Sequence, residues 1–212
     1  MADDARAPER PGDRSGAPTY NDILDQDSRT VPKYLREDCV PDIDARSVPA
    51  KNYTDPEFFQ QEVDRVWSSC WQMVCREEDI PNVGDFIVFN QAHRSYLIVR
   101  SGPNDFKALL NVCLHRGRQL ATCAGSAKKF RCMFHGLEWN IDGSFKHNPI
   151  EWDFPQWKDQ DLTLPQAQVD RWAGFVFVNF DPKAAPLDSV IHPHPEHFER
   201  YRLDDMYNMD HV

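Results

Sequence analysis

The chain has 212 residues, and its 41% hydrophobic and 27% charged residues are typical of a globular protein. No apolar run approaches the roughly 20 residues that span a bilayer, and the first twenty residues lack the apolar centre of a secretory signal. A net charge of −10 argues against general binding to nucleic acid or anionic membranes. We therefore expect a cytoplasmic protein with no nucleic-acid or membrane partner. Its six cysteines favour metal ligation over a disulfide framework.

The charge is distributed unevenly along the chain. Residues 107–146 carry seven basic and two acidic side chains, although acidic residues outnumber basic ones by 34 to 24 in the whole chain. A solvated face would account for this basic stretch, and so would a docking surface for an acidic partner, because complementary potentials steer encounter. Both interpretations remain open at the level of sequence.

The first fifty residues contain little that could be buried. Residues 1–18 are rich in Asp, Arg, Pro and Gly, which predicts a disordered tail. Residues 19–50 are interrupted by prolines, which predicts an extended arm over the surface. The sequence therefore predicts a tail and an arm over residues 1–50.

The first regular element is expected at residues 55–69, as a helix. Thr54 and Glu57 have the spacing of a capping box, and Pro56 suits the first helical turn. Apolar residues then recur at helical spacing, which predicts a face packed on a sheet. These residues are Phe59, Val63, Val66 and Trp67.

From residue 71 the pattern changes to short β-type segments separated by turn residues. Asp142–Gly143 is the strongest hairpin signal among those turns. Many short strands with Gly and Pro turns predict an all-β, antiparallel sandwich or barrel. The strand pattern then gives way to a Pro-interrupted segment, with a short helix expected near 195–202. The expected strands are 71–75, 85–89, 95–100, 106–112, 128–132, 137–141, 144–146, 163–169 and 174–180.

Two similar motifs carry the candidate chemistry, with the spacing C-x-H-x16-C-x-x-H. Each motif follows a predicted strand, so two loops could hold one object between them. Two thiolates and two imidazoles suit either a tetrahedral structural zinc or a Rieske [2Fe–2S] cluster, in which one iron takes two Cys and the other two His. Zinc sites usually pair Cys with Cys and His with His along the chain, whereas each loop here mixes them, which favours the cluster. The four candidate ligands are Cys113, His115, Cys132 and His135.

A glycine closes each motif. We expect Gly117 and Gly136 to let the backbone approach the sulfides of a cluster and donate N–H hydrogen bonds to them, a contact of the kind that sets a reduction potential.

The two motifs resemble the Rieske domain of the large (alpha) subunit of aromatic ring-hydroxylating oxygenases. N-V-C-L-H-R-G-R-x-L (111–120) and C-M-F-H-G-L-x-W-x-x-D-G (132–143) carry most of the resemblance. Flanking segments match in order, so the resemblance covers about residues 50–185. They are E-F-F-Q-Q-E-V-D-R-V-W (57–67), D-I-P-N-V-G-D-F (79–86), L-I-V-R (97–100) and W-A-G-F-V-F-V-N-F-D-P (172–182).

This resemblance implies a Rieske-type β-sandwich with a two-loop cluster-binding subdomain, to which the local patterns add one N-terminal helix and a disordered N-terminal tail. It implies a Rieske domain at residues 51–185, followed at 186–212 by a linker or the truncated start of a catalytic domain. By the same resemblance Cys113 and Cys132 would ligate one iron of a [2Fe–2S] cluster, and His115 and His135 the other. A reductase or ferredoxin would supply electrons, and a homo-oligomer or a catalytic subunit is a further possible partner.

The sequence departs from the wider Rieske pattern in ways that the resemblance makes informative. Arg118 and Phe134 stand where respiratory Rieske proteins carry a disulfide, and Leu137 replaces their hydroxyl residue, which points to the oxygenase or ferredoxin type. The full-length oxygenase family also holds a mononuclear Fe(II) in a catalytic domain, and no site for it is seen in this sequence. His192 and His197 have that site's H-x4-H spacing, but the prolines between them are expected to prevent the helix that would place both on one face, so we interpret the segment as a polar surface loop.

Three functions follow from these observations. The first is electron transfer as the N-terminal part of a ring-hydroxylating oxygenase large subunit, an oxidoreductase family, with this chain alone lacking the mononuclear iron site for turnover. The second is a stand-alone Rieske ferredoxin, and the third is a zinc-stapled binding module. The predicted helix at 55–69 and the segment after residue 185 favour the first over the second.

Overall fold

The structure is a computed structural model that describes residues 18–36, 48–207 and 209. The chain divides into two compact units, Met1–Val48 and Pro49–Val212. In the first unit, the expectation of a fully extended arm over residues 19–50 is wrong, because a helix α1 (Tyr20–Asp25) and a 3-10 turn η2 (Lys33–Arg36) lie within it. Thr19 and Asp22 cap α1 reciprocally, a local signal that the sequence reading passed over. The tail expected at residues 1–18 lies almost wholly outside the described residues.

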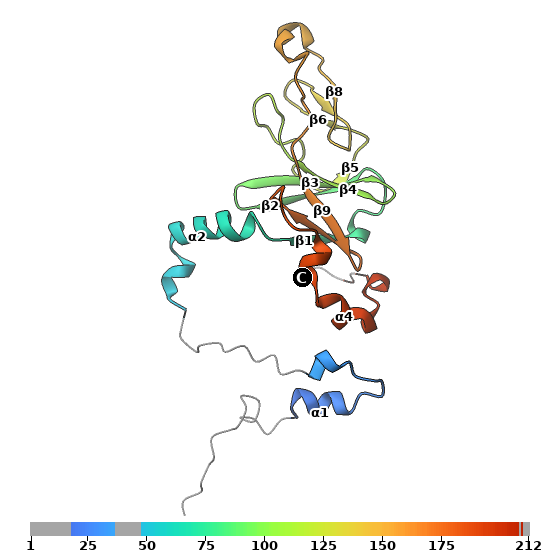
Figure 1. Cartoon of the computed structure of the whole chain (residues 1–212). Helices are drawn as coiled ribbons and strands as arrows, with labels where there is room; N and C mark the ends of the chain where they lie inside the picture. The colour runs from blue at the N-terminus through green and yellow to red at the C-terminus, as the bar shows by residue number, and fades with distance from the viewer. Residues whose placement is uncertain (1–17, 37–47, 208, 210–212) are drawn as a thin grey trace, which may run out of the picture. The chain divides into compact units, whose positions relative to one another are not determined.

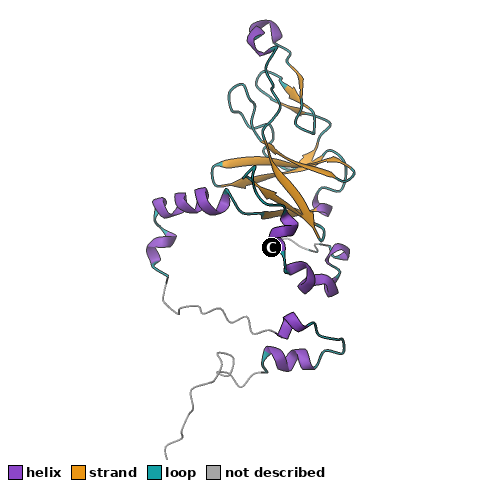
Figure 2. Cartoon of the chain, viewed as in Figure 1, coloured by secondary structure: helices purple, strands orange, loops and turns teal. Residues whose placement is uncertain are grey.

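The second unit is built on a seven-stranded sheet whose neighbouring strands are all antiparallel (Figures 1 and 2). The prediction of an all-β antiparallel domain is therefore confirmed. Consecutive strands β2, β3 and β4 form a meander, and β9 joins it to β10 and β1. In sheet order the strands are β1 (Gln72–Arg76), β10 (Phe175–Asn179), β9 (Gln166–Trp172), β4 (Asp105–Leu110), β3 (Arg94–Gly102), β2 (Asp85–Gln91) and β5 (Gly125–Ser126).

A three-stranded subdomain projects from one side of this sheet (Figure 1). Its strands are β6 (Phe130–Arg131), β7 (Glu138–Trp139) and β8 (Phe145–His147). The hairpin predicted at Asp142–Gly143 joins β7 to β8, with Gly143 at φ +88°. Each of the nine predicted strands is present in the structure. The two-residue strand β5 was missed because it has no apolar pattern.

Two cores meet at the interior strand β3. Its side chains alternate between the faces of the sheet, so Leu97 and Val99 join one core and Ile98 the other, all with no exposed surface. The first core continues into the subdomain through Trp139 and the candidate ligands Cys113 and Cys132. The cysteines therefore fix both loops of the candidate site to the hydrophobic interior of the domain.

The helix predicted at 55–69 is present as α2 (Pro56–Glu62), continued by a π-helical turn η4 (Val63–Trp67). Asp55, and not Thr54, caps it, by accepting a hydrogen bond from the Glu57 N–H. The expected packed face is only partly formed. Val63 is buried, whereas Phe59, Val66 and Trp67 are 44%, 45% and 37% exposed. The π turn widens the last turn, so the later apolar residues leave the face that α-helical spacing assigns to them.

Short helical segments make up the rest of the unit. The helix expected near 195–202 is present as α4 and η8. No helix carries both His192 and His197, as expected, because α3 ends at Ile191 and α4 begins only at His194, although the segment is helical rather than the loop that was expected. A helix begins at His194 because Pro195 lies in its first turn, where no intrahelical N–H bond is lost. The Nδ1 atom of His192 lies 3.0 Å from the Oε1 atom of Glu196. The segments are η3 (Ala50–Tyr53), η5 (Glu77–Asp79), η6 (Glu151–Asp153), η7 (Pro155–Trp157), α3 (Leu187–Ile191), α4 (His194–Phe198), η8 (Glu199–Tyr201) and η9 (Leu203–Asp205).

Among the described residues, no helix combines the length and the apolar character needed to cross a membrane.

Gly84 provides a test of how the sheet and the segment between the two loops are joined. Its φ is +95°, and a Cβ there would lie 2.5 Å from the Ala127 carbonyl oxygen. Gly84→Ala is expected to destabilise the fold by about 1–3 kcal/mol from backbone strain, before any clash is counted. Gly125→Ala is the control, since its Cβ would make only ordinary contacts of 3.5 Å with Phe86. Urea unfolding measures both, and equal stabilities would contradict the account.

Candidate metal centre

The first candidate loop follows β4 and spans residues 113–118. The Cys113 N–H donates to the Arg118 carbonyl at 2.7 Å, and the Gly117 N–H donates to the Cys113 carbonyl at 2.9 Å. These two bonds close a tight turn. The His115 and Arg116 N–H groups remain on its inner side and hydrogen-bond toward the Cys113 thiol.

The second loop, residues 132–137 between β6 and β7, repeats this geometry. The Cys132 N–H donates to the Leu137 carbonyl and the Gly136 N–H to the Cys132 carbonyl, both at 2.9 Å. Although the histidine stands two residues after the cysteine in one loop and three in the other, the two loops close in the same way. The resemblance between the motifs is therefore a resemblance in backbone shape.

The glycines act differently from the expectation. Gly117 and Gly136 have φ values of +72° and +79°, so each supplies the left-handed residue that the turn requires. Their N–H groups are bonded to the cysteine carbonyls and are not directed at a cluster, which corrects the predicted role. In the first loop the donors next to the thiol come instead from His115 and Arg116.

The two cysteines meet in the interior. Cys113 and Cys132 are each 2% exposed, belong to the same core and lie close enough for their thiols to interact. Burial raises the pKa of the Cys113 thiol, and the neighbouring Cys132 adds to the rise, while the His115 and Arg116 N–H groups oppose it. A metal that binds here therefore displaces protons from buried thiols.

The two histidines meet on the outer side of the loops. The ring centroids of His115 and His135 lie 4.7 Å apart, and both side chains are partly exposed. Burial lowers the pKa of His115, and the positive charge available to His135 and Arg116 lowers it further. Both effects favour the neutral imidazole, which is the form that binds metals.

Two aromatic residues that the sequence reading missed enclose His115. Phe154 and Trp157 are stacked on each other, with centroids 4.4 Å apart, and their rings meet His115 edge-on at 4.9 and 5.3 Å. They come from the 3-10 turns between β8 and β9, about forty residues after the histidine. No local signal links these residues to the motif.

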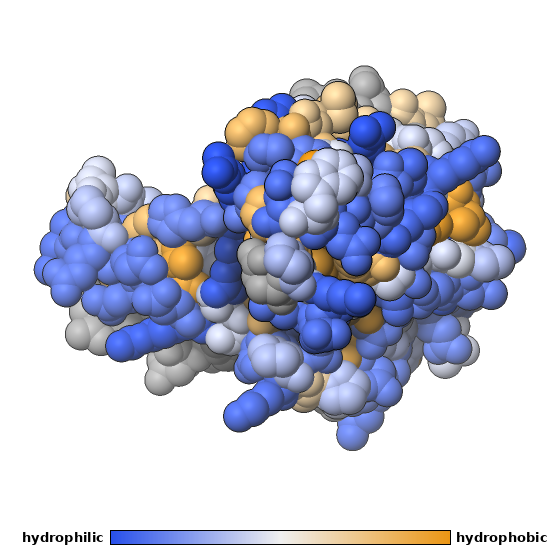
Figure 3. Space-filling view, turned by 90° about the horizontal axis from the view of Figure 1, so that it is seen from above, coloured by the Kyte–Doolittle hydropathy of each residue, from blue (hydrophilic) through white to orange (hydrophobic). Residues whose placement is uncertain are grey.

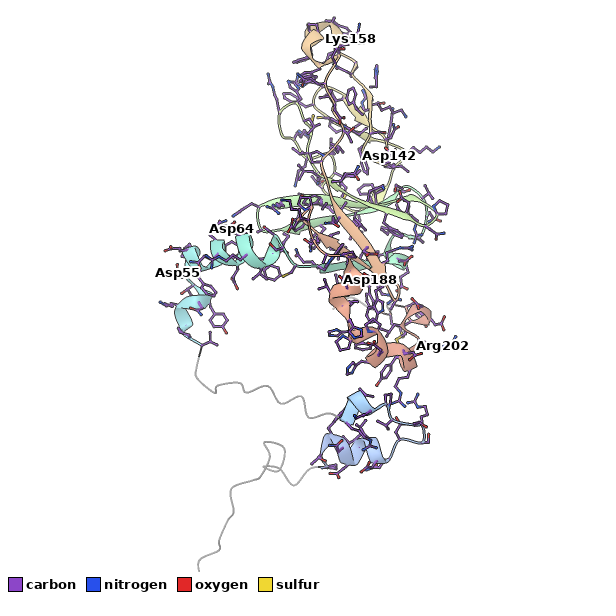
Figure 4. All side chains as sticks on the ribbon, in the orientation of Figure 1. Asp55, Asp64, Asp142, Lys158, Asp188 and Arg202 are labelled. Atoms are coloured by element: carbon purple, nitrogen blue, oxygen red, sulfur yellow. The ribbon has the colours of Figure 1, made fainter. Side chains whose placement is uncertain are left out.

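The surface around the loops combines apolar and basic side chains. Met133 and Phe134 are 77% and 55% exposed, and Arg116 lies over the Phe134 ring at 5.7 Å. Seen from the subdomain end, the surface is mainly hydrophilic with smaller apolar patches (Figure 3). The subdomain extends from Asp142, beside the seven-stranded sheet, to Lys158 at its far end (Figure 4).

The donor set fits a two-iron cluster. In space, thiol lies beside thiol and imidazole beside imidazole, although each loop mixes the two along the chain. The Nδ1 atom of His135 is buried and has no hydrogen-bond partner in the described part of the protein, as expected of a ligand atom. In the described part of the protein, no group of three or more His, Cys, Asp or Glu side chains is placed to hold a single metal ion. A Rieske cluster requires no such group, because each of its irons takes only two protein ligands.

Comparisons with known proteins agree with this geometry. A family model for the Rieske [2Fe–2S] domain matches residues 70–158. Biphenyl 2,3-dioxygenase subunit alpha of Rhodococcus jostii (strain RHA1) is 30% identical over 164 residues, which cover 76% of this chain and 36% of that protein. The carnitine monooxygenase oxygenase subunit of Escherichia coli (strain K12) is 29% identical over 154 residues, or 72% of this chain and 41% of that subunit.

Solved structures give the same result. Naphthalene 1,2-dioxygenase from Rhodococcus sp., bound to indole, superposes with a TM-score of 0.66 at 26% identity, over 72% of this chain and 36% of that one. The chain thus spans 36% to 41% of the length of the relatives named here. Residues 70–158, which include both loops, form a Rieske [2Fe–2S] domain, and the chain is similar to the alpha subunits of Rieske oxygenases over the part of them that it spans.

Proposed function

We propose that Cys113, His115, Cys132 and His135 hold the [2Fe–2S] cluster of this domain. The two thiolates would bind one iron and the two imidazoles the other. The observation that carries the proposal is the pairing of like donors, buried thiols on one side and partly exposed imidazoles on the other. A structural zinc would make no use of this sorting of thiols from imidazoles.

The protein around these ligands has three tasks. A cluster of this type, when bound, takes up and releases single electrons. The first core keeps water from the two thiols, since Trp139 and Leu137 pack around them with at most 1% exposure. The inner N–H groups of the first loop stabilise the thiolate form of Cys113. Phe154 and Trp157 fix the orientation of the His115 ring.

We further propose that this electron transfer serves an oxygenase large subunit. The similarity to the alpha subunits named above supports this assignment over a stand-alone ferredoxin. Residues 51–185 would be the electron-transfer domain, and the helical segments of 186–212 the lead into a catalytic domain with its own mononuclear iron. The donor would be a reductase or a ferredoxin, and exposed Phe134 and Arg116 beside the imidazoles offer it an apolar contact with a basic rim.

Metal and sulfide analysis tests the proposal directly. The purified 212-residue chain, reconstituted without oxygen, is expected to hold two irons and two acid-labile sulfides. Dithionite is expected to reduce it by one electron per chain and to generate the paramagnetic resonance signal of a Rieske cluster, and an electron acceptor to reverse this. One zinc per chain and no sulfide would show that the site is a zinc staple.

A further inference from the structure

Asn111 is a buried polar side chain at the entrance to the first loop. It follows β4 directly, stands two residues before Cys113 and is only 2% exposed. Burying an amide is costly unless its donors and acceptors are paired. The partners of Asn111 therefore indicate what its burial serves.

All the hydrogen-bonding capacity of the Asn111 amide is used. Its Nδ2 donates to the Ser95 Oγ at 3.0 Å and to the Ala121 carbonyl at 2.7 Å. Its Oδ1 accepts from the N–H groups of Leu120 and Ala121, at 2.9 and 3.1 Å. Three of these four bonds reach the segment by which the first loop returns, and the fourth reaches β3.

The backbone of Asn111 is fixed to β3 as well, because its N–H donates to the Ser95 carbonyl at 2.9 Å. The amide thus ties the exit of the loop, at residues 120–121, to its entrance and to the seven-stranded sheet. One side chain thus connects backbone groups that lie nine and ten residues further along the chain.

The second loop needs no such tie. Its two ends are paired as strands, with Phe130 opposite Trp139 and Arg131 opposite Glu138. The first loop enters from β4 but leaves through residues 118–124, which are not in a strand. The Asn111 side chain takes the place of the missing strand pairing by satisfying the Leu120 and Ala121 N–H groups.

We propose that Asn111 is a positioning residue that holds the first loop in its cluster-binding shape, so that Cys113 and His115 are in place before iron arrives. This rests on the proposed function, since it takes these two residues as ligands. Groups that hold ligands in place without touching the metal commonly alter metal affinity about 10- to 100-fold when removed. The structure also offers a matched control for this role.

The control is Asn179, on β10 in the other part of the sheet. It is 1% exposed, donates to the Ser69 carbonyl at 3.1 Å and accepts from the Asp181 N–H at 2.9 Å. Removing either buried amide leaves backbone groups unpaired, so Asn111→Ala and Asn179→Ala are both expected to lower the unfolding temperature. Only the first is expected to change the cluster.

The experiment compares the 212-residue proteins, all reconstituted in the same way. Loss of the visible absorbance in excess iron chelator is expected to be about 10- to 100-fold faster for Asn111→Ala than for Asn179→Ala. The paramagnetic resonance spectrum of the reduced Asn111 variant is expected to shift, and that of the Asn179 variant to match the wild type. Asn111→Asp keeps the shape and the accepting oxygen but loses both donations from Nδ2, to Ser95 and to Ala121, so an intermediate rate is expected.

If Asn111→Ala does not fold, Asn111→Asp still tests the positioning role of Asn111. Wild-type rates and spectra in the Asn111 variants, or equal changes in the Asn179 control, would overturn the positioning role alone. A wild-type protein that binds neither iron nor sulfide would instead overturn the proposed function. The two failures are therefore distinguished by the wild-type sample.

Discussion

Replacing Cys113 or Cys132 by alanine is expected to abolish cluster binding. Each cysteine would supply half of the thiolate ligands of one iron, and no other cysteine of the described residues lies in the same buried core. Iron and sulfide per chain are expected to fall from two each to near zero, with loss of the visible colour and of the paramagnetic resonance signal. Colorimetric iron and sulfide assays after parallel reconstitution measure this.

The same substitutions are expected to destabilise the fold. Both cysteines lie in the first core, so a bound cluster would tie the subdomain to the seven-stranded sheet from within, and binding free energy would add to folding free energy. Chemical unfolding is therefore expected to begin at lower urea in the cysteine variants than in the reconstituted wild type. The difference is expected to disappear largely when both are compared without iron.

Cys123→Ala is the matched control for the substitutions of Cys113 and Cys132. Cys123 lies between the two loops but is exposed, and it has no disulfide partner among the described cysteines. Its replacement is expected to leave iron, sulfide and spectrum unchanged. A full cluster in Cys113→Ala, or its loss in Cys123→Ala, would contradict the assignment of ligands.

The parts of the structure that could be predicted from sequence are those set by local patterns. Short β-type segments bounded by turn residues located the nine strands, and two short motifs located both loops. The helix after Pro56 was also visible, but its packing was not, because a π turn moved Val66 and Trp67 away from the expected face. Helical periodicity assumes a constant number of residues per turn, and here that number changes within the helix.

The residues missed around the site act across long distances in the chain. Trp157 and Phe154 reach His115 from turns after β8, and their sequence gives no indication of this contact. Asn111 was visible within N-V-C-L-H, but its partners at residues 120–121 and in β3 are brought together only by the fold. A ligand is recognised by its chemistry, whereas a positioning residue is recognised only by what it contacts.

Trp139→Ala is expected to cause the largest loss of stability among single substitutions outside the ligands. Trp139 has no exposed surface, meets Phe145 edge-on at 5.8 Å and packs in the core that contains both candidate thiolates. Truncating a buried aromatic residue costs about 3–5 kcal/mol. A total stability of about 5–15 kcal/mol is typical of a domain, so much of it would be lost.

Two further tryptophan variants separate the causes of this loss. Trp139 Nε1 donates to the Leu162 carbonyl at 2.8 Å, so Trp139→Phe keeps most of the ring but leaves that buried carbonyl unpaired, at an expected cost of about 1–3 kcal/mol. Trp152 is 75% exposed on η6, and Trp152→Ala is expected to change stability by less than about 0.5 kcal/mol. Urea unfolding of the iron-free proteins measures the free energy of unfolding of Trp139→Ala, Trp139→Phe and Trp152→Ala.

The Trp139 variants also test how far the core and the candidate site depend on each other. If the thiolates are held by the packing around them, Trp139→Ala is expected to release the reconstituted cluster to chelator faster than Trp152→Ala, with Trp139→Phe in between. This order follows from the position of Trp139 in β7, directly after the second loop and in one core with Cys113 and Cys132. A destabilised Trp139→Ala protein that released iron at the wild-type rate would show that the two loops hold their shape without this core.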